Sequence, residues 1–180
     1  EARYGIWILV LAAVAILACV QYALDMVVIN HVARARGAMN HDQAIRFSST
    51  AFVMYLCIGL TGALLIFALA PLLGGPVLGI TAENSGAALA CFRAGALLFL
   101  AETLYHWGAA VFKGMEDFIW PSFIQLLIIF GVYASACHII LSGQPLYTVL
   151  LAGAGCFGAG AVFNILILAV FRKLPLSFSA

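Results

Sequence analysis

Five long runs of apolar residues decide what this chain can fold into. Each exceeds the roughly 20 residues that a helix needs to cross the hydrocarbon core of a bilayer. Lipid offers no hydrogen-bonding partners, so the backbone of such a run must satisfy itself within a helix. We therefore predict an all-α, polytopic membrane helix bundle in a single transmembrane domain, with five spans at residues 5–29, 49–73, 87–112, 119–141 and 146–171.

The composition agrees with lipid as the surrounding solvent. Of the 180 residues, 66% are hydrophobic and only 8% are charged, whereas soluble domains carry about 25% charged residues. The net charge of +1 provides no general attraction to nucleic acid, so we expect no nucleic-acid partner. The five cysteines are scattered through the apolar runs, a pattern that fits neither a disulfide framework nor a zinc motif. We expect no metal and no cofactor.

Short polar segments mark the turns between the runs. Asn40 and Gln43 form the pattern of a capping box, which predicts a short helix leading into the second span. The sequence Gly143-Gln144-Pro145 predicts a tight turn before the fifth span, and Gly74-Gly75-Pro76 predicts the end of the second.

The fifth run is rich in small residues. Ala154 and Gly158, like Gly155 and Ala159, are four residues apart and lie on one face of a helix. Such pairs let two helices approach closely. They indicate tight packing inside the bundle or, as an alternative, a surface along which helices slide.

Basic residues predict the orientation of the chain. They gather on the side reached after the first, third and fifth runs: Arg34, Arg36, Arg46, Lys113, Arg172 and Lys173. The opposite side holds Arg3, and Arg93 lies within the third run. By the positive-inside rule the N-terminal end lies outside and the C-terminal end in the cytoplasm. An outside start at Glu1 without a signal peptide predicts an upstream helix that belongs to a longer protein.

Ionisable residues at membrane depth are costly, and the third run contains most of them. Relative to Glu102, His106 is rotated by about 40° and Lys113 by about 20° around the helix. The three side chains form a stripe that should face the bundle interior or a water-filled cavity. Glu102 and His106 are candidates for proton or ion coupling, because imidazole titrates near neutral pH. A structural Glu–His hydrogen bond is the alternative, with Lys113 extending to the interface.

Two further charges need partners. Arg93 points away from Glu102, either outward to the interface or into a cavity where it would bind phosphate. Lys113 is the second candidate for substrate binding. Asp25 lies near the predicted cytoplasmic end of the first span. It is a third candidate for ion or proton coupling, or it pairs with Arg34 or Arg36.

Three segments carry a resemblance to a known family. They are Glu1–Gly5, the stretch HVARARGAMNHDQAIRFSSTA from His31 to Ala51, and FKGMEDFIWPSFIQ from Phe112 to Gln125. Together they resemble the outer and inner turns of the Wzx-type polysaccharide flippases, which transport O-antigen and exopolysaccharide precursors. These flippases belong to the multidrug/oligosaccharidyl-lipid/polysaccharide exporter superfamily. The chain is similar to helices two to six of their N-terminal lobe. The family's Asp-x-Gly and downstream Arg align with Gln21-Tyr22-Ala23 and Asn30, so those roles are not transferred.

The resemblance implies a function in the bacterial inner membrane. The substrate would be an undecaprenyl-diphosphate-linked oligosaccharide, flipped from the inner to the outer leaflet by alternating access. Its partners would be membrane lipids and the remainder of a two-lobe transporter. Such a protein is not an enzyme, and we predict no catalytic residue.

Three alternatives remain open. One is a multidrug/cation antiporter or peptidoglycan-lipid flippase of the same superfamily. Another is a polyprenyl-lipid enzyme that uses Glu102 and His106 as acid and base, although no nucleotide-binding, metalloprotease or hydrolase motif is present. The third is a non-catalytic membrane subunit.

Overall fold

The computed structural model describes residues 2–75 and 80–170. Within these ranges the chain forms five α-helices and no strand: α1 (Ala2–Gly37), α2 (His41–Leu73), α3 (Ala82–Gly114), α4 (Ile119–Leu141) and α5 (Tyr147–Val170). All five are long and apolar enough to cross a membrane, which confirms the predicted helical bundle. The predicted features at Glu1, Pro76, Phe171, Arg172 and Lys173 lie outside the described residues.

The first two helices are longer than the apolar runs that identified them. α1 continues from the predicted end at residue 29 to Gly37, and α2 begins at His41 rather than residue 49. Apart from Gly37 at the last position of α1, neither extension contains Gly or Pro. Asn40 accepts a hydrogen bond from the Gln43 backbone N–H at 3.0 Å, which is one half of the predicted capping box. The Asn40 N–H bonds to the Ala35 carbonyl, so the other half is not formed. The separate short helix is therefore wrong, because it is the first part of α2, and Arg34, Arg36 and Arg46 lie on helices.

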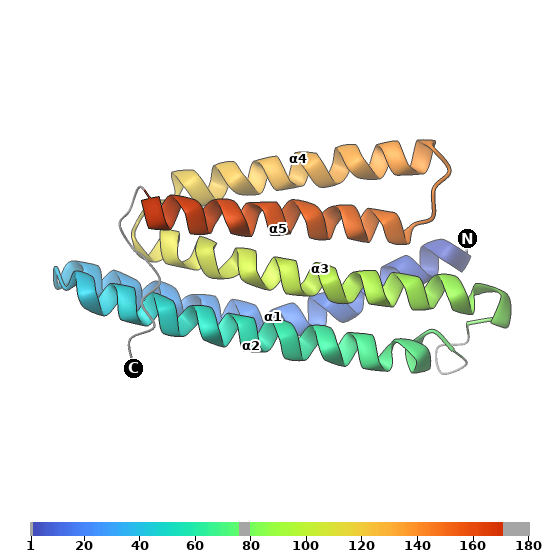
Figure 1. The fold of residues 1–180 in the computed structure, drawn as a ribbon, viewed down its shortest axis with the longest axis horizontal. Helices are drawn as coiled ribbons and strands as arrows, with labels where there is room; N and C mark the ends of the chain where they lie inside the picture. The colour runs from blue at the N-terminus through green and yellow to red at the C-terminus, as the bar shows by residue number, and fades with distance from the viewer. Residues whose placement is uncertain (1, 76–79, 171–180) are drawn as a thin grey trace.

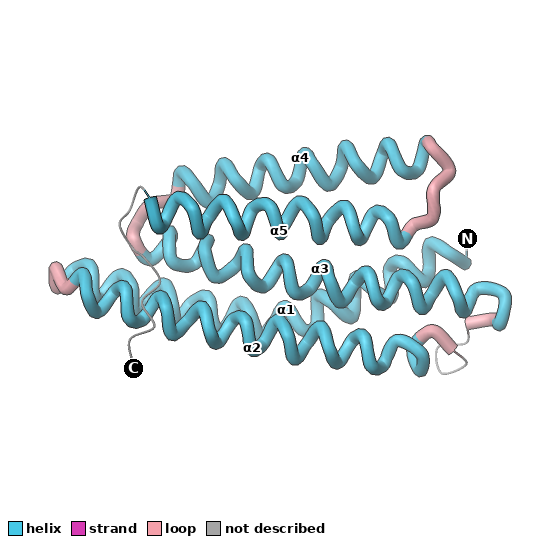
Figure 2. The backbone as a smooth tube through the Cα atoms, viewed as in Figure 1, coloured by secondary structure: helices cyan, strands magenta, loops and turns pink. Residues whose placement is uncertain are grey.

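Three turns share one geometry. After α1, the Asn40 N–H bonds to the Ala35 carbonyl and the Met39 N–H to the Arg36 carbonyl, with Met39 at φ 52°. This is the Schellman arrangement, in which a left-handed residue ends the helix. The turn after α3 repeats it with Glu116 at φ 61°, and the turn after α4 repeats it with Gly143 at φ 67°. These tight turns return each helix antiparallel to the one before it (Figure 2).

α3 is the central helix of the bundle. Figure 1 shows α4 and α5 on one side of α3, with α1 and α2 on the other. α3 packs against α1, α2 and α5, whereas α4 packs mainly on α5. The largest fully buried side chains include Trp107, Phe92, Phe99 and Phe112, all on α3. α3 therefore positions any side chain that points from its surface toward the outer helices.

Close approach between helices depends on glycine at defined positions. A Cβ atom at Gly95 would lie 2.5 Å from Val10 of α1, and one at Gly108 would lie 2.5 Å from Asn164 of α5. The pairs predicted on α5 do not make such contacts, because a Cβ at Gly155 or Gly158 would meet nothing within 4 Å. The packing face of α5 is instead the one that carries Asn164, together with Gly153 and Gly160.

Candidate functional site

A long groove separates α1 from α4. Two adjoining cavities of ≈ 410 Å³ and ≈ 420 Å³ form it, and both are lined by Tyr22, Glu102 and Phe157. α1 and α4 supply opposite walls, while α3 and α5 supply residues between them. Cavities of this size fall within the range that binds small molecules.

The two halves of the groove differ in chemistry. The half near the start of α1 is mainly apolar, with Trp7, Leu11 and Leu150 among its lining residues, although Glu102 also reaches it. The half near the α3–α4 turn contains eight polar or ionisable side chains: Tyr22, Asp25, Glu102, Tyr105, His106, Lys113, Ser122 and Gln125. The groove therefore offers a charged section and an apolar section that adjoin at Tyr22, Glu102 and Phe157.

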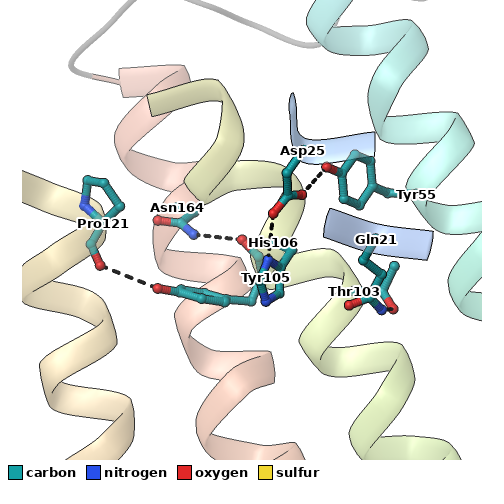
Figure 3. Close-up of polar contacts among 8 residues, drawn as sticks. All are labelled: Gln21, Asp25, Tyr55, Thr103, Tyr105, His106, Pro121 and Asn164. Carbon is teal, nitrogen blue, oxygen red and sulfur yellow. Dashed lines mark hydrogen bonds and ion pairs between the residues drawn. The ribbon is translucent and has the colours of Figure 1, made fainter. Parts of the chain in front are cut away.

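Asp25 links three helices at the charged section (Figure 3). Its Oδ2 atom lies 2.9 Å from Nδ1 of His106 on α3. Its Oδ1 atom accepts a hydrogen bond from the hydroxyl group of Tyr55 on α2. Asp25 is buried and Tyr55 has no exposed surface. A carboxylate in such a place requires donors at both oxygens, and this arrangement provides them.

A second polar contact lies one turn earlier on α1. The Gln21 side-chain amide donates to the Thr103 hydroxyl, which donates to the Phe99 carbonyl at 2.6 Å. Gln21 and Asp25 are four residues apart and therefore share one face of α1. Together they tie α1 to α3 through two polar contacts. Figure 3 shows Gln21 beside Thr103 and Asp25 beside His106.

α5 and α4 are joined to α3 through Tyr105. The Asn164 amide donates to the Tyr105 carbonyl, and the Tyr105 hydroxyl donates to the Pro121 carbonyl, each at 3.3 Å. Pro121 is the third residue of α4 and is buried, which places its carbonyl next to α3. The floor of the groove is thereby fixed to its α4 wall.

The predicted stripe on α3 is found in the groove. Glu102, His106 and Lys113 all line the same cavity, although each is partly exposed. The alternative interpretation, a hydrogen bond between Glu102 and His106, is not found among the described residues, and Nδ1 of His106 contacts Asp25 instead. In the described part of the chain, Glu102 has no hydrogen-bonded partner. It is an acceptor that faces the groove.

The predicted pairing of Asp25 with Arg34 or Arg36 is wrong. Nine residues along a helix correspond to about 13 Å, so Arg34 lies too far along α1 to meet Asp25. The partners are His106 and Tyr55, which come from other helices. Asp25 nevertheless lines the groove together with Glu102 and His106, the other two candidates for ion or proton coupling.

Arg93 is placed outside the groove. It is exposed, and its guanidinium group lies 5.1 Å from the ring centroid of Phe67 on α2. This is a cation–π contact. Arg93 and Glu102 therefore occupy different faces of α3, as their spacing predicts. Of the two residues predicted to bind substrate, Lys113 is the one that lines the groove.

Sequence reasoning missed Tyr55 and Thr103. Each lies within an apolar run and makes its polar contact with a helix far away in sequence. The four-residue spacing of Gln21 and Asp25 was the available signal, because two polar residues on one buried helix face need partners. Among residues 2–75 and 80–170, no group of three His, Cys, Asp or Glu side chains is placed to hold a metal ion.

Comparison with protein-family models, curated proteins and solved structures finds no match. The chemistry of this groove is therefore the basis for assigning a function.

Proposed function

We propose that this chain belongs to a flippase that moves an undecaprenyl-diphosphate-linked oligosaccharide from the inner to the outer leaflet of a bacterial inner membrane. The observation that carries this proposal is the groove between α1 and α4. A substrate with a polar headgroup and a long hydrocarbon tail needs a polar surface inside the membrane and an apolar surface beside it. The groove has both in adjoining sections.

Each groove residue has a role in this proposal. Lys113 lies close to the α3–α4 turn and is a point charge suited to a phosphate group. Glu102, His106 and Asp25 lie deeper along the groove and can exchange protons or bind a coupling ion. With the basic ends of α1 and α3 in the cytoplasm, Lys113 would meet the headgroup in the leaflet from which it starts.

An export experiment tests this proposal. The complete gene product carrying Glu102→Gln should restore surface polysaccharide to a deletion strain at least about ten-fold less well, as expected when about 1.4 kcal/mol of a required interaction is lost. Glu83→Gln is the matched control, since Glu83 is exposed in the first turn of the same helix. Normal export with Glu102→Gln at normal protein levels would refute the proposal, as would normal surface polysaccharide in the deletion strain itself.

A proton-coupled multidrug or cation antiporter is the second candidate. The charge of the groove favours it, because Asp25 and Glu102 are two carboxylates against the single ammonium group of Lys113. A cavity with this balance suits a cationic substrate better than a diphosphate. The two candidates separate in one comparison: the antiporter lowers cellular accumulation of ethidium, whereas the flippase changes surface polysaccharide alone.

A further inference from the structure

The contact with Asp25 determines how the imidazole ring of His106 is used. A carboxylate accepts hydrogen bonds and has no hydrogen to donate. Oδ2 of Asp25 lies 2.9 Å from Nδ1 of His106, so Nδ1 must carry the hydrogen of this bond. The Tyr55 hydroxyl occupies the other carboxylate oxygen. It thereby holds Asp25 in the orientation that His106 requires.

The other ring nitrogen of His106 is open to the groove. Nε2 has no hydrogen-bond partner among the described residues, and it is not one of the buried unpaired atoms, which belong to Trp7, Gln21 and Asn164. The rings of Tyr22 and Tyr105 stand edge-on to the imidazole at centroid distances of 5.5 Å and 5.8 Å. They flank the ring and leave Nε2 uncovered. In the neutral ring this nitrogen presents a lone pair.

Glu102 adds a second acceptor beside Nε2. It precedes His106 by one helical turn, which places the two Cβ atoms about 6 Å apart. Its side chain lines both cavities and has no hydrogen bond within the described residues. Both acceptors lack a donor from the described part of the chain and are partly exposed in the groove, so the donors of a ligand can reach them.

We propose that Glu102 and His106 Nε2 form a binding site for hydrogen-bond donors, with Tyr55 and Asp25 as the residues that position His106. The ligand chemistry is a headgroup bearing hydroxyl or ammonium donors next to an apolar tail. This inference deepens the proposed function, since it assigns the headgroup site of the same groove. It rests on that function only for the identity of the natural substrate.

Nitrogen-15 NMR of the full chain in phosphatidylcholine nanodiscs tests the positioning role. In the neutral ring, the His106 signals should show hydrogen on Nδ1 and none on Nε2. His106→Gln identifies these signals among the four histidines. Hydrogen on Nε2, in either the neutral or the doubly protonated ring, would overturn the inference.

Two phenylalanine variants separate positioning from folding. Tyr55→Phe removes the hydroxyl that holds Asp25, and the Nε2–H form of His106 should then appear in the spectrum. Tyr105→Phe is the matched control, because it removes another buried hydroxyl, which bonds to Pro121 rather than to Asp25. Its spectrum should keep the wild-type protonation pattern. An unchanged pattern in Tyr55→Phe would overturn the role of Tyr55.

Three probes with the same alkyl chain test the ligand chemistry. An alkyl glucoside carries hydroxyl donors, an alkylammonium carries N–H donors, and an alkylphosphocholine carries neither. The glucoside, the alkylammonium or both should shift the His106 Nε2 signal. The probe with the larger shift identifies the type of donor that the site prefers. The phosphocholine should not shift it. No shift with either donor probe, or an equal shift with all three, would overturn the donor site.

Export and the His106 NMR signal test the flippase and the donor site separately. Loss of export in Glu102→Gln together with a silent His106 signal would leave the flippase standing and remove the donor site. A specific shift with a donor probe, combined with normal export in the deletion strain, would leave the donor site and remove the flippase.

Discussion

Asp25 and His106 lie 81 residues apart in sequence and 2.9 Å apart in the folded chain. One comes from α1 and the other from α3, and both line the groove between α1 and α4. Their contact joins α3, the most buried of the five helices, to the α1 wall of the groove.

Asp25 and His106 should be energetically coupled. Hydrogen bonds to charged groups contribute about 1.5–3 kcal/mol, and removing one partner leaves the other unpaired. Asp25→Asn, His106→Gln and the double variant should therefore be non-additive by about 1–3 kcal/mol in a double-mutant cycle. Chemical unfolding in detergent micelles measures these values. Asp42→Asn, at an exposed position on α2, combined with His106→Gln should be additive, and equal behaviour of the two cycles would refute the coupling.

Gly108→Ala should destabilise the bundle, because the new Cβ would lie 2.5 Å from the Cβ of Asn164. Overpacking of this kind costs typically about 1–3 kcal/mol. Gly158→Ala on α5 meets nothing within 4 Å and should be neutral or stabilising by up to about 1 kcal/mol, since alanine favours the helix. Thermal unfolding of both variants provides the comparison. Equal midpoints would contradict the close approach of α3 to α5 at Gly108 and Asn164.

Met39→Gly should stabilise the turn between α1 and α2. Met39 has φ 52° and is 95% exposed, so the substitution removes strain without removing packing. A left-handed non-glycine residue costs about 1–2 kcal/mol, of which the flexibility of glycine in the unfolded chain cancels about half. The expected gain is about 0.5–1 kcal/mol, read as a higher unfolding midpoint. Met39→Ala keeps the Cβ and should show no gain.

Lys113→Gln should weaken binding of a lipid-linked phosphate, whereas Arg93→Gln should leave it within about two-fold of wild type. Both substitutions remove one positive charge from α3, but only Lys113 lines the groove. Losing a charge-assisted hydrogen bond of about 1.5–3 kcal/mol corresponds to roughly ten-fold or more in affinity. Titration of nanodiscs with a short-chain polyprenyl phosphate measures both variants. A larger effect from Arg93→Gln would move the phosphate site to the opposite face of α3.

Much of the fold could be predicted because apolar length and turn residues are local signals. The five spans and the turn at Gly143 are examples. The predicted end of α1 and the predicted start of α2 followed the apolar runs, but both helices extend beyond these runs. Hydrophobicity indicates which residues lie in the membrane, whereas a helix can continue into water. The turns at Met39 and Glu116 have no glycine at the left-handed position, so composition did not reveal them.

The site was predictable on one helix and not across helices. The spacing of Glu102, His106 and Lys113 specifies their common face, and they line one cavity. The partner of Asp25 depends on how α1 is rotated against α2 and α3, which no local pattern encodes. For the same reason Tyr55 was indistinguishable from an interfacial aromatic residue until its contact with Asp25 was known.

The central claim is that a polar groove opens between α1 and α4 within the membrane-spanning bundle. Ile129 lines this groove, and its neighbour Phe130 is 66% exposed and lines none of the described cavities. Both lie about 15 Å along α4 from its start, near the middle of a bilayer. Each is changed to cysteine in a variant lacking the five native cysteines, and labelling by a small water-soluble maleimide is measured in native membranes. The account predicts rapid labelling at position 129 and almost none at position 130, whereas equal labelling at the two positions would contradict it.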